Sequence, residues 1–464
     1  MDIQNELTID FSQLLGHSWS VKKEDVEAYS AEISKAAKTV NHLRKTGKGP
    51  DGSAVYFSHL PYILDEELLI SAEEKEDLKK LDGFGKQQDI LISIGIGGSY
   101  LGNQSIFDAF CGPYWNLMDK EERHGYPKVF FAGQNLDPTS LLQLADQVER
   151  ESKELGRKCK VILLAISKSG TTIEPSSAIH GLTDVLKPFA DIHILAITDK
   201  EKGVLRQYAN DHHLTCFTVP DGIGGRFSEL SQVGLVFCKL IGINIEELLA
   251  GAKMVEESCR SEKLAENPAL YLAALKYIAT KKYGIVSEVI MPYGNHLRSL
   301  GWWYAQLLGE SLGKKYDNDG NIVHYGRIPV STVGTTDMHS LTQEHQQGAK
   351  NKLVQFISVP EREEDLEVFC EEKGVSGKVP MSFMLETARR ANEEALASEG
   401  RMSCNIALRK LDPFHVGAFM YFCFLAIAYE GALANINAFD QPGVEDYKKI
   451  LHKGIRRYIE AHSI

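Results

Sequence analysis

The stretch that decides the fold is Asp89-Ile90-Leu91-Ile92-Ser93-Ile94-Gly95-Ile96-Gly97-Gly98-Ser99, an aliphatic run followed by a glycine-rich turn. Three similar aliphatic runs follow along the chain, at 128–132, 161–166 and 192–197. Short runs of β-branched and aliphatic residues, separated by helical patterns, are typical of strands buried on both faces of a parallel sheet. This part of the chain is therefore predicted to be an α/β unit.

The second half of the chain echoes this order of elements, although no residue-level repeat is visible. A mostly helical stretch at 231–283 leads to strand-like runs at 286–291 and 352–359, with a helix carrying Trp302 and Trp303 between them. The acidic segment 361–365 suggests the start of a solvated helix. A second α/β unit with a mostly parallel sheet is therefore expected.

The two ends of the chain show helical periodicity instead. Apolar residues recur at helical spacing over 22–45, before a Gly-Lys-Gly-Pro break, and again from Val444 to Tyr458. The predicted organisation is a helical N-terminal arm at 1–48, α/β domains at 49–230 and 231–440, and a C-terminal helix at 441–464.

The charge balance limits the partners that this chain can have. The 464 residues include 51 Lys and Arg against 63 Asp and Glu, a formal net charge of −12. This surplus of acids argues against nucleic acid and against an anionic membrane surface, because both attract basic proteins. It still allows a small anionic substrate, since a pocket needs only local positive potential.

Hydropathy and cysteine usage favour a cytoplasmic protein. The longest charge-free apolar stretch, 416–429, is shorter than the roughly 20 residues that span a bilayer, and it is interpreted as a buried helix. The N-terminus lacks the pattern of a signal peptide. The eight cysteines are scattered without Cys-x-x-Cys spacing, which predicts reduced core thiols and neither a disulfide framework nor a metal site.

The glycine-rich turn at 95–99 has features of an anion site. Glycines allow close approach of a ligand to the backbone, and the following helix start offers free N–H groups. The dinucleotide fingerprint G-x-G-x-x-G fails, because its last position is Tyr100. A tight turn that needs glycine only for packing remains an alternative.

A second polar loop, Ser167-Lys168-Ser169-Gly170-Thr171-Thr172, also follows a predicted strand. It is not a Walker A loop, but its hydroxyl groups suit a phosphomonoester, and the helix start adds N–H groups. Helix capping is the alternative role for any one hydroxyl. Both loops follow parallel strands, so they are expected at the carboxyl edge of the sheet, where α/β proteins bind ligands.

Six motifs resemble those of the phosphoglucose isomerase family. They are Gly-Ile-Gly-Gly-Ser at 95–99, Ser-Lys-Ser-Gly-Thr-Thr at 167–172, Gly-Gly-Arg-Phe-Ser at 224–228, Gly-Glu-Ser-Leu-Gly-Lys at 309–314, Asp-Met-His-Ser at 337–340 and Phe-Asp-Gln-Pro-Gly-Val-Glu at 439–445. They occur in the family's order. The resemblance implies two sugar-isomerase (SIS) type, flavodoxin-like domains and a homodimer. It also implies metal-free, cofactor-free interconversion of glucose 6-phosphate and fructose 6-phosphate, a step of glycolysis and gluconeogenesis.

The resemblance also implies the role of each site residue. The substrate-binding residues are Gly98, Ser99, Ser167, Lys168, Ser169 and Thr172 in the two loops, and Gln441 as a positioning amide. Glu310 matches the base and Arg226 the arginine beside the reacting carbons. His339 and Lys448 match the ring-opening groups, with their division of labour left open. In the family this histidine reaches the pocket of the neighbouring subunit.

The chemistry asks for the same residue types. Moving a proton between C1 and C2 through a cis-enediol(ate) needs one carboxylate, and Glu310 could serve as that general base. The oxygen that becomes negative needs a cation that stays protonated, which suits Arg226. Opening the sugar ring needs a group that titrates near neutrality, such as His339, with Lys448 to supply charge or a proton.

Simpler interpretations of these residues stand beside the catalytic one. Glu310 could be a surface residue, Arg226 could cap a carbonyl or pair with Glu229, His339 could be a core histidine, and Lys448 could be solvated. Two other functions are also considered, a non-catalytic sugar-phosphate sensor and a metal-dependent isomerase. The sensor would not need the four residues together, and the metal enzyme would need a cluster of His and acidic ligands that the sequence does not suggest.

Overall fold

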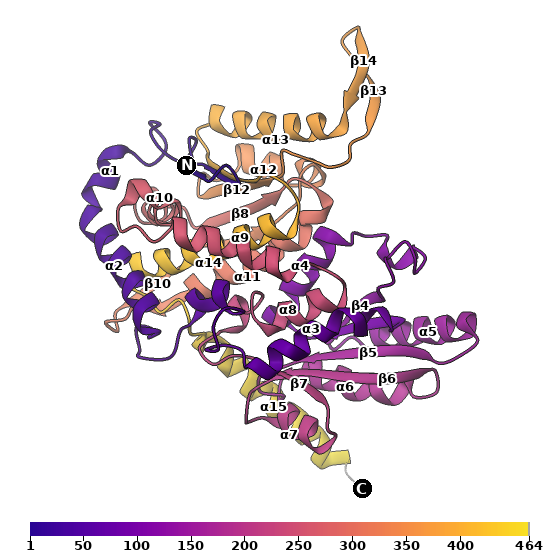
Figure 1. Ribbon diagram of the computed structural model, residues 1–464. Helices are drawn as coiled ribbons and strands as arrows, with labels where there is room; N and C mark the ends of the chain where they lie inside the picture. The colour runs from indigo at the N-terminus through magenta and orange to yellow at the C-terminus, as the bar shows by residue number, and fades with distance from the viewer. Residues whose placement is uncertain (463–464) are drawn as a thin grey trace.

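The first sheet contains the strands that the aliphatic runs predict. This computed structural model describes residues 1–462. The five strands of the sheet are β3 (Ile90–Ile94), β4 (Lys128–Ala132), β5 (Cys159–Ile166), β6 (Ala190–Thr198) and the short β7 (Thr215–Thr218). All neighbours are parallel, in the order β4-β3-β5-β6-β7 (Figure 1).

The second sheet has six strands in the order β1-β2-β15-β12-β8-β11. Its parallel part consists of β8 (Ser287–Pro292), β11 (Ile328–Ser331), β12 (Lys352–Ser358) and β15 (Met402–Leu408). The antiparallel strands β1 (Asp2–Ile3) and β2 (Leu7–Asp10) complete one edge. The predicted α/β class with two mostly parallel sheets is confirmed. The N-terminal segment is not wholly helical as expected, because it begins with two strands of this sheet.

The helices that connect and cover the sheets agree with the prediction in part: the stretch 231–283 is helical, and the stretch 22–45 forms two helices where one was expected. The N-terminal pair is α1 (Lys23–Ala28) and α2 (Ser30–Thr46), and the stretch predicted to be mostly helical contains α8 (Gln232–Leu240), α9 (Ile245–Ser258) and α10 (Pro268–Tyr283). The remaining helices of the first half are α3 (Ala72–Lys86), α4 (Leu101–Phe110), α5 (Pro138–Leu155), α6 (Ile173–Leu186) and α7 (Val204–Asp211). Those of the second half are α11 (Arg298–Leu312), α12 (Thr342–Gln347), α13 (Met381–Ser398), α14 (Pro413–Leu433) and α15 (Glu445–His462).

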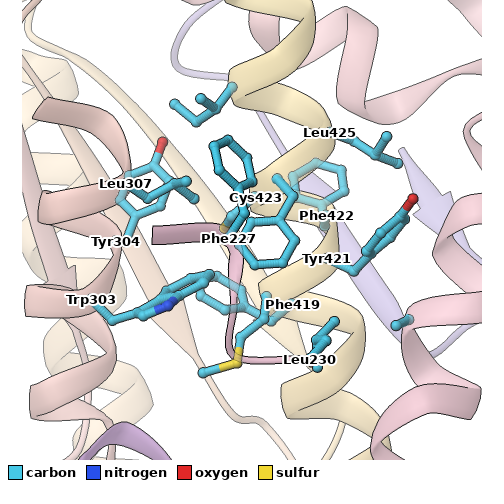
Figure 2. Packing of buried hydrophobic residues seen from close by; sticks show 14 of the residues in the cluster. Phe227, Leu230, Trp303, Tyr304, Leu307, Phe419, Tyr421, Phe422, Cys423 and Leu425 are labelled. Atoms are coloured by element: carbon cyan, nitrogen blue, oxygen red, sulfur yellow. The ribbon is translucent and has the colours of Figure 1, made fainter. Parts of the chain in front are cut away.

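The central helix α14 organises the core of the protein. It contacts α2, α9, α10 and α11, and 94% of its most apolar window is buried. By length and composition it could cross a membrane, but burial among other helices is the simpler reason for its apolar surface, as the sequence predicts. Figure 2 shows Trp303, Tyr304 and Leu307 on the helix beside α14, and the ring centroids of Trp303 and Phe419 lie 6.4 Å apart. This packing fixes α11 against α14.

The two sheets meet where α4 packs against α11. The helix α4 follows β3 of the first sheet, and α11 follows β8 of the second. The 3₁₀ turn Gly97–Ser99 contacts a second 3₁₀ turn, Gly225–Phe227, which also contacts α11. Side chains at 97–99, at 225–227 and on α11 therefore come together from distant parts of the sequence.

Two hairpins and the C-terminal helix complete the fold. The hairpin of β9 (Lys314–Tyr316) and β10 (Ile322–Tyr325) follows α11. The hairpin of β13 (Glu367–Glu372) and β14 (Val375–Pro380) projects from the body of the protein (Figure 1). The expected helix start at 361–365 is wrong, because this segment leads irregularly into β13.

The predicted C-terminal helix is present as α15, and its last two expected positions, 463–464, lie outside the described residues. The eight cysteines, all within the described residues, are free thiols, and six of them are buried, as predicted for core thiols. Cys216 and Cys370 are half-buried. The expected domain boundaries at 48, 230 and 440 stay predictions.

Candidate active site

The two polar loops lie side by side because their strands are neighbours. Ile94 at the end of β3 pairs with Ala165 near the end of β5, so the loops at 97–99 and 167–172 leave the same edge of the sheet. A Cβ added to Gly98 would lie 2.0 Å from the carbonyl oxygen of Gly225. Glycine at 98 is thus needed for the close packing of the two turns. The same packing places the turn 97–99 next to Arg226.

The hydroxyl groups of the second loop are arranged to donate to a ligand. Ser167 Oγ accepts a hydrogen bond from the Gly170 N–H at 3.1 Å. Ser169 Oγ accepts from the Thr171 N–H at 3.2 Å and from Thr171 Oγ1 at 2.9 Å. A serine hydroxyl that accepts in this way still has its own proton to donate. The oxygen atoms of Ser167 and Ser169 therefore stabilise the loop as hydrogen-bond acceptors, and their hydroxyl protons remain available to donate to an anion.

The start of α6 adds backbone donors at the same place. Thr172 is the N-cap residue of α6, and within the described residues its side chain makes no capping hydrogen bond. Its hydroxyl is therefore not used by the helix. The N–H groups of the first turn of a helix lack intrahelical partners and attract anions. Lys168 belongs to the same loop, but its Nζ pairs with Asp221 Oδ1 at 3.1 Å.

Arg226 lies beside these loops and is held on several sides. Its side chain is 1% exposed. Nε donates to Ser311 Oγ at 2.7 Å, Nη1 to Gln441 Oε1 at 3.2 Å, and Nη2 to the carbonyl oxygens of Ala438 and Asp440. Burial lowers the pKa of Arg226, and the carboxylates of Glu310 and Asp440 oppose this shift. The guanidinium stays charged, because arginine keeps its proton in proteins.

Glu310 lies in the last turn of α11 and faces this cation. Its Oε2 is 3.6 Å from Arg226 Nη1, and its Oε1 accepts a hydrogen bond from Gln306 Nε2 at 3.0 Å. Gln306 lies four residues earlier on the same helix face, which is the spacing at which helical side chains meet. The side chain of Glu310 is 32% exposed, so the carboxylate is oriented by two partners and remains open to the cavity.

All predicted site residues except His339 line one cavity of about 760 Å³, a volume typical of small-molecule sites. They are Gly98, Ser99, Ser167, Lys168, Ser169, Thr172, Arg226, Glu310, Gln441 and Lys448. Lys448 Nζ lies 3.2 Å from Glu445 Oε1 one turn away on α15. His339 is exposed at the end of the 3₁₀ turn Thr336–His339, outside this cavity. The interpretation of His339 as a core histidine is wrong.

The structure also decides between the simpler interpretations of Arg226. Arg226 does donate to carbonyl oxygens, as the interpretation of this residue as a carbonyl cap proposed. Pairing with Glu229 is wrong, because both carboxylate oxygens of Glu229 are buried without a hydrogen-bond partner among the described residues. Burial raises the pKa of Glu229 well above its usual range.

Sequence reasoning missed Gln306, Ser311 and Lys314, which contact Glu310 or Arg226. Ser311 and Lys314 belong to the quoted Gly-Glu-Ser-Leu-Gly-Lys motif, and the helical spacing of Gln306 and Glu310 was visible in the sequence.

The side chains that could bind a metal do not suggest a metal centre, since no cluster of three or more His, Cys, Asp or Glu suited to a metal occurs in residues 1–462.

The loop 167–172 presents hydroxyl groups at the carboxyl edge of a parallel sheet, and the Glu310 carboxylate faces the Arg226 guanidinium beside it. This combination is that of an α/β phosphosugar isomerase. Comparison with known proteins agrees with this class. The family model described as phosphoglucose isomerase matches residues 79–463. The chain belongs to the phosphoglucose isomerase family.

Individual relatives cover most of the chain. The chain is 34% identical over 459 residues to the glucose-6-phosphate isomerase of Carboxydothermus hydrogenoformans, covering 96% of this chain and 93% of that protein. It is 34% identical to the glucose-6-phosphate isomerase of Shouchella clausii, covering 91% and 90%.

Solved structures show the same fold. The hypothetical protein TT0462 from Thermus thermophilus has a TM-score of 0.78 at 27% identity, covering 97% of this chain and 99% of that one. A glucose-6-phosphate isomerase from Chlamydia trachomatis has a TM-score of 0.79 at 22% identity, covering 99% and 91%.

The hydroxyl of Thr172 is predicted to bind the phosphate of a hexose 6-phosphate. Thr172→Val removes this donor and leaves α6 stable, because the hydroxyl does not cap the helix. A hydrogen bond to a charged group contributes about 1.5–3 kcal/mol, so affinity should fall about 10- to 100-fold. Isothermal titration calorimetry measures the loss, and Thr172→Ser, which keeps the hydroxyl, should bind almost as well as the wild type. Unchanged binding by Thr172→Val would show that the hydroxyl does not contact the ligand.

Proposed function

We propose that this chain interconverts glucose 6-phosphate and fructose 6-phosphate, in glycolysis and gluconeogenesis, by proton transfer without a metal or cofactor. One observation carries the proposal: Glu310 faces the buried Arg226 in a cavity that the hydroxyl-rich loop 167–172 also lines. The relatives named above, which are called glucose-6-phosphate isomerase, support the substrate pair. An aldose–ketose isomerisation oxidises one carbon and reduces its neighbour, so no external redox partner is needed.

Glu310 is the general base in this proposal. It removes the proton from one carbon of the C1–C2 pair and returns it to the other through a cis-enediol(ate). The hydrogen bond from Gln306 Nε2 to Oε1 orients the carboxylate, and Oε2 is open toward Arg226. A positioned general base contributes about 10²–10⁴-fold to a rate.

Arg226 stabilises the negative oxygen of the enediolate. Its charge is fixed in place before the reaction by four hydrogen-bond acceptors, so little reorganisation is required when the oxygen becomes negative. Because the guanidinium does not give up its proton, it stabilises the intermediate without competing with Glu310 for protons. Gln441, which accepts from Nη1, helps to position the substrate beside this cation.

The phosphate is held by Ser99, Ser167, Ser169 and Thr172, with Gly98 and Lys168 in the same loops. The free hydroxyl donors described above support this assignment. Ring opening falls to Lys448, which lines the cavity, and to a histidine. We propose that this histidine is His339 of a second copy in a homodimer. Its exposure, outside the cavity of its own chain, supports a contact with another chain.

A cytoplasmic location is part of the same proposal. The eight free thiols support it, because reduced cysteines are typical of that compartment.

Glu310→Gln tests the base. The amide keeps the size of the side chain but cannot accept a proton, so exchange should fall by at least about 10²-fold while sugar-phosphate binding persists. Fructose 6-phosphate is incubated in heavy water, and deuterium is followed by NMR at its C1 and at C2 of glucose 6-phosphate. Glu154→Gln, an exposed change on α5, is the matched control and should exchange normally. Near-normal deuterium incorporation by Glu310→Gln would remove Glu310 from the base role.

Mixed dimers test the sharing of sites. Glu310→Gln and His339→Ala variants should each be inactive as homodimers. When they are unfolded, mixed and refolded together, one of the two sites in a mixed dimer has both intact groups, so activity should recover to about a quarter of the wild-type value. Differently tagged subunits allow the mixed dimers to be isolated by tandem affinity purification. Isolated mixed dimers without activity would mean that each chain supplies its own histidine.

A further inference from the structure

Lys314 is a buried cation that the proposed reaction does not yet use. It closes the Gly-Glu-Ser-Leu-Gly-Lys motif, just beyond the end of α11, and its side chain is 6% exposed. Its Nζ donates to the carbonyl oxygen of Glu310 at 2.6 Å and to that of Asp440 at 2.8 Å. The Asp440 carboxylate lies 3.2 Å away. The three donors of the ammonium group thus have three acceptors.

Burial of this ammonium group carries an electrostatic cost. Desolvation lowers the pKa of Lys314, the nearby charge of Arg226 lowers it further, and Asp440 and Glu310 oppose both effects. Two cations are therefore held close together in a poorly solvated region. A cation near the carboxyl end of a helix interacts favourably with the helix dipole, but an exposed lysine would have the same interaction without the cost of burial. The position of Lys314 calls for a more specific explanation.

The contacts of Lys314 connect the two groups that face the reacting carbons. Lys314 and Arg226 donate to the same oxygen, the carbonyl of Asp440. Lys314 also binds the backbone of Glu310, whose side chain faces Arg226. The end of α11 is in this way tied to the segment 438–441, and that segment binds the guanidinium.

We propose that Lys314 is a positioning residue that fixes the Glu310 carboxylate relative to the Arg226 guanidinium. The proposal rests on the isomerase function proposed above. Lys314 does not act on the substrate, because its ammonium group already has acceptors in the protein and it is not among the residues that line the cavity. A displacement of about 1 Å at a reacting group can cost about 10²-fold in rate, so a clamp between these groups affects the chemical step.

The clamp predicts a specific kinetic signature for Lys314→Met. This variant keeps the length of the apolar stem and loses both hydrogen bonds and the ion pair with Asp440. Its kcat for fructose 6-phosphate should fall about 10- to 100-fold, and KM should change less than about threefold, since the phosphate loop is untouched. Lys315→Met, the same change at the exposed neighbouring residue, is the matched control and should keep both constants.

A second readout separates positioning from simple stability. With fructose 6-phosphate deuterated at C1, a fixed carboxylate returns part of the deuterium to C2 of glucose 6-phosphate and loses the rest to water. A loosened carboxylate in Lys314→Met should return a smaller fraction. Lys314→Arg keeps a buried cation with several donors and should recover part of the lost kcat and of the deuterium transfer. It also serves as the test variant if Lys314→Met does not fold, and it should then show both defects in milder form.

The results that overturn the proposal are distinct from failure of the isomerase function. A wild-type chain without isomerase activity would refute the proposed function. If the wild type is active, two results would refute the positioning role alone. One is a folded Lys314 variant that keeps its kcat within twofold, and the other is a variant that loses kcat with unchanged deuterium transfer. A rise in KM alone would also refute it, because that would indicate a binding role.

Discussion

Arg226 carries a full positive charge into a region where only 1% of its side chain is exposed. Burying an unpaired ion costs several kcal/mol, so the surrounding groups must compensate for the lost water. The compensating groups come from two segments that are distant from Arg226 in sequence: Glu310 and Ser311 at the end of α11, and the residues 438–441 before α15. The need to satisfy this one guanidinium therefore brings together the groups of the proposed active site.

The rest of the fold supports this arrangement through packing. Phe227, next to Arg226, lies 5.1 Å from Phe424 of α14 between ring centroids, and Trp303 of α11 lies 5.6 Å from the same ring. The core that Figure 2 shows thus fixes both the turn that carries Arg226 and the helix that carries Glu310. The hydroxyl-rich loop 167–172, which is proposed to bind the phosphate, needs no cluster of positive charges. Its hydroxyl groups and helix N–H groups explain how a chain with a net charge of −12 can bind a dianion.

The sequence predicts those parts of the fold that repeat a simple pattern. The runs at β3 and β5 are mostly aliphatic and almost fully buried, and the runs at β4 and β6 are mostly apolar but only partly buried. Strand β15 was missed because Ser403 and Asn405 interrupt its apolar residues, and the structure shows that Asn405 is buried by pairing with Ser358. Strands β1 and β2 were missed because they are short, although residues 7–10 alternate between buried and exposed positions.

The same distinction holds for the site. Residues in recognisable motifs, such as Ser169 and Glu310, were predicted from the sequence to act together, and they line one cavity. Ser311 and Lys314 were not singled out, because their significance lies in contacts with Arg226 and Asp440 that exist only after folding. The exposed position of His339 in a single chain could not be predicted from residue patterns either.

In the proposed mechanism, a fixed guanidinium and one carboxylate carry out the isomerisation without a metal. The most direct measurement is the conversion of fructose 6-phosphate to glucose 6-phosphate by the purified chain after exhaustive dialysis against EDTA, followed with a coupled dehydrogenase. The dialysed wild type is expected to keep full activity. The kcat of Arg226→Lys, which keeps a charge but not the planar set of donors, is expected to fall by about 10²–10³-fold. Activity that disappears on dialysis and returns with a divalent cation, or an Arg226→Lys variant as active as the wild type, would contradict this mechanism.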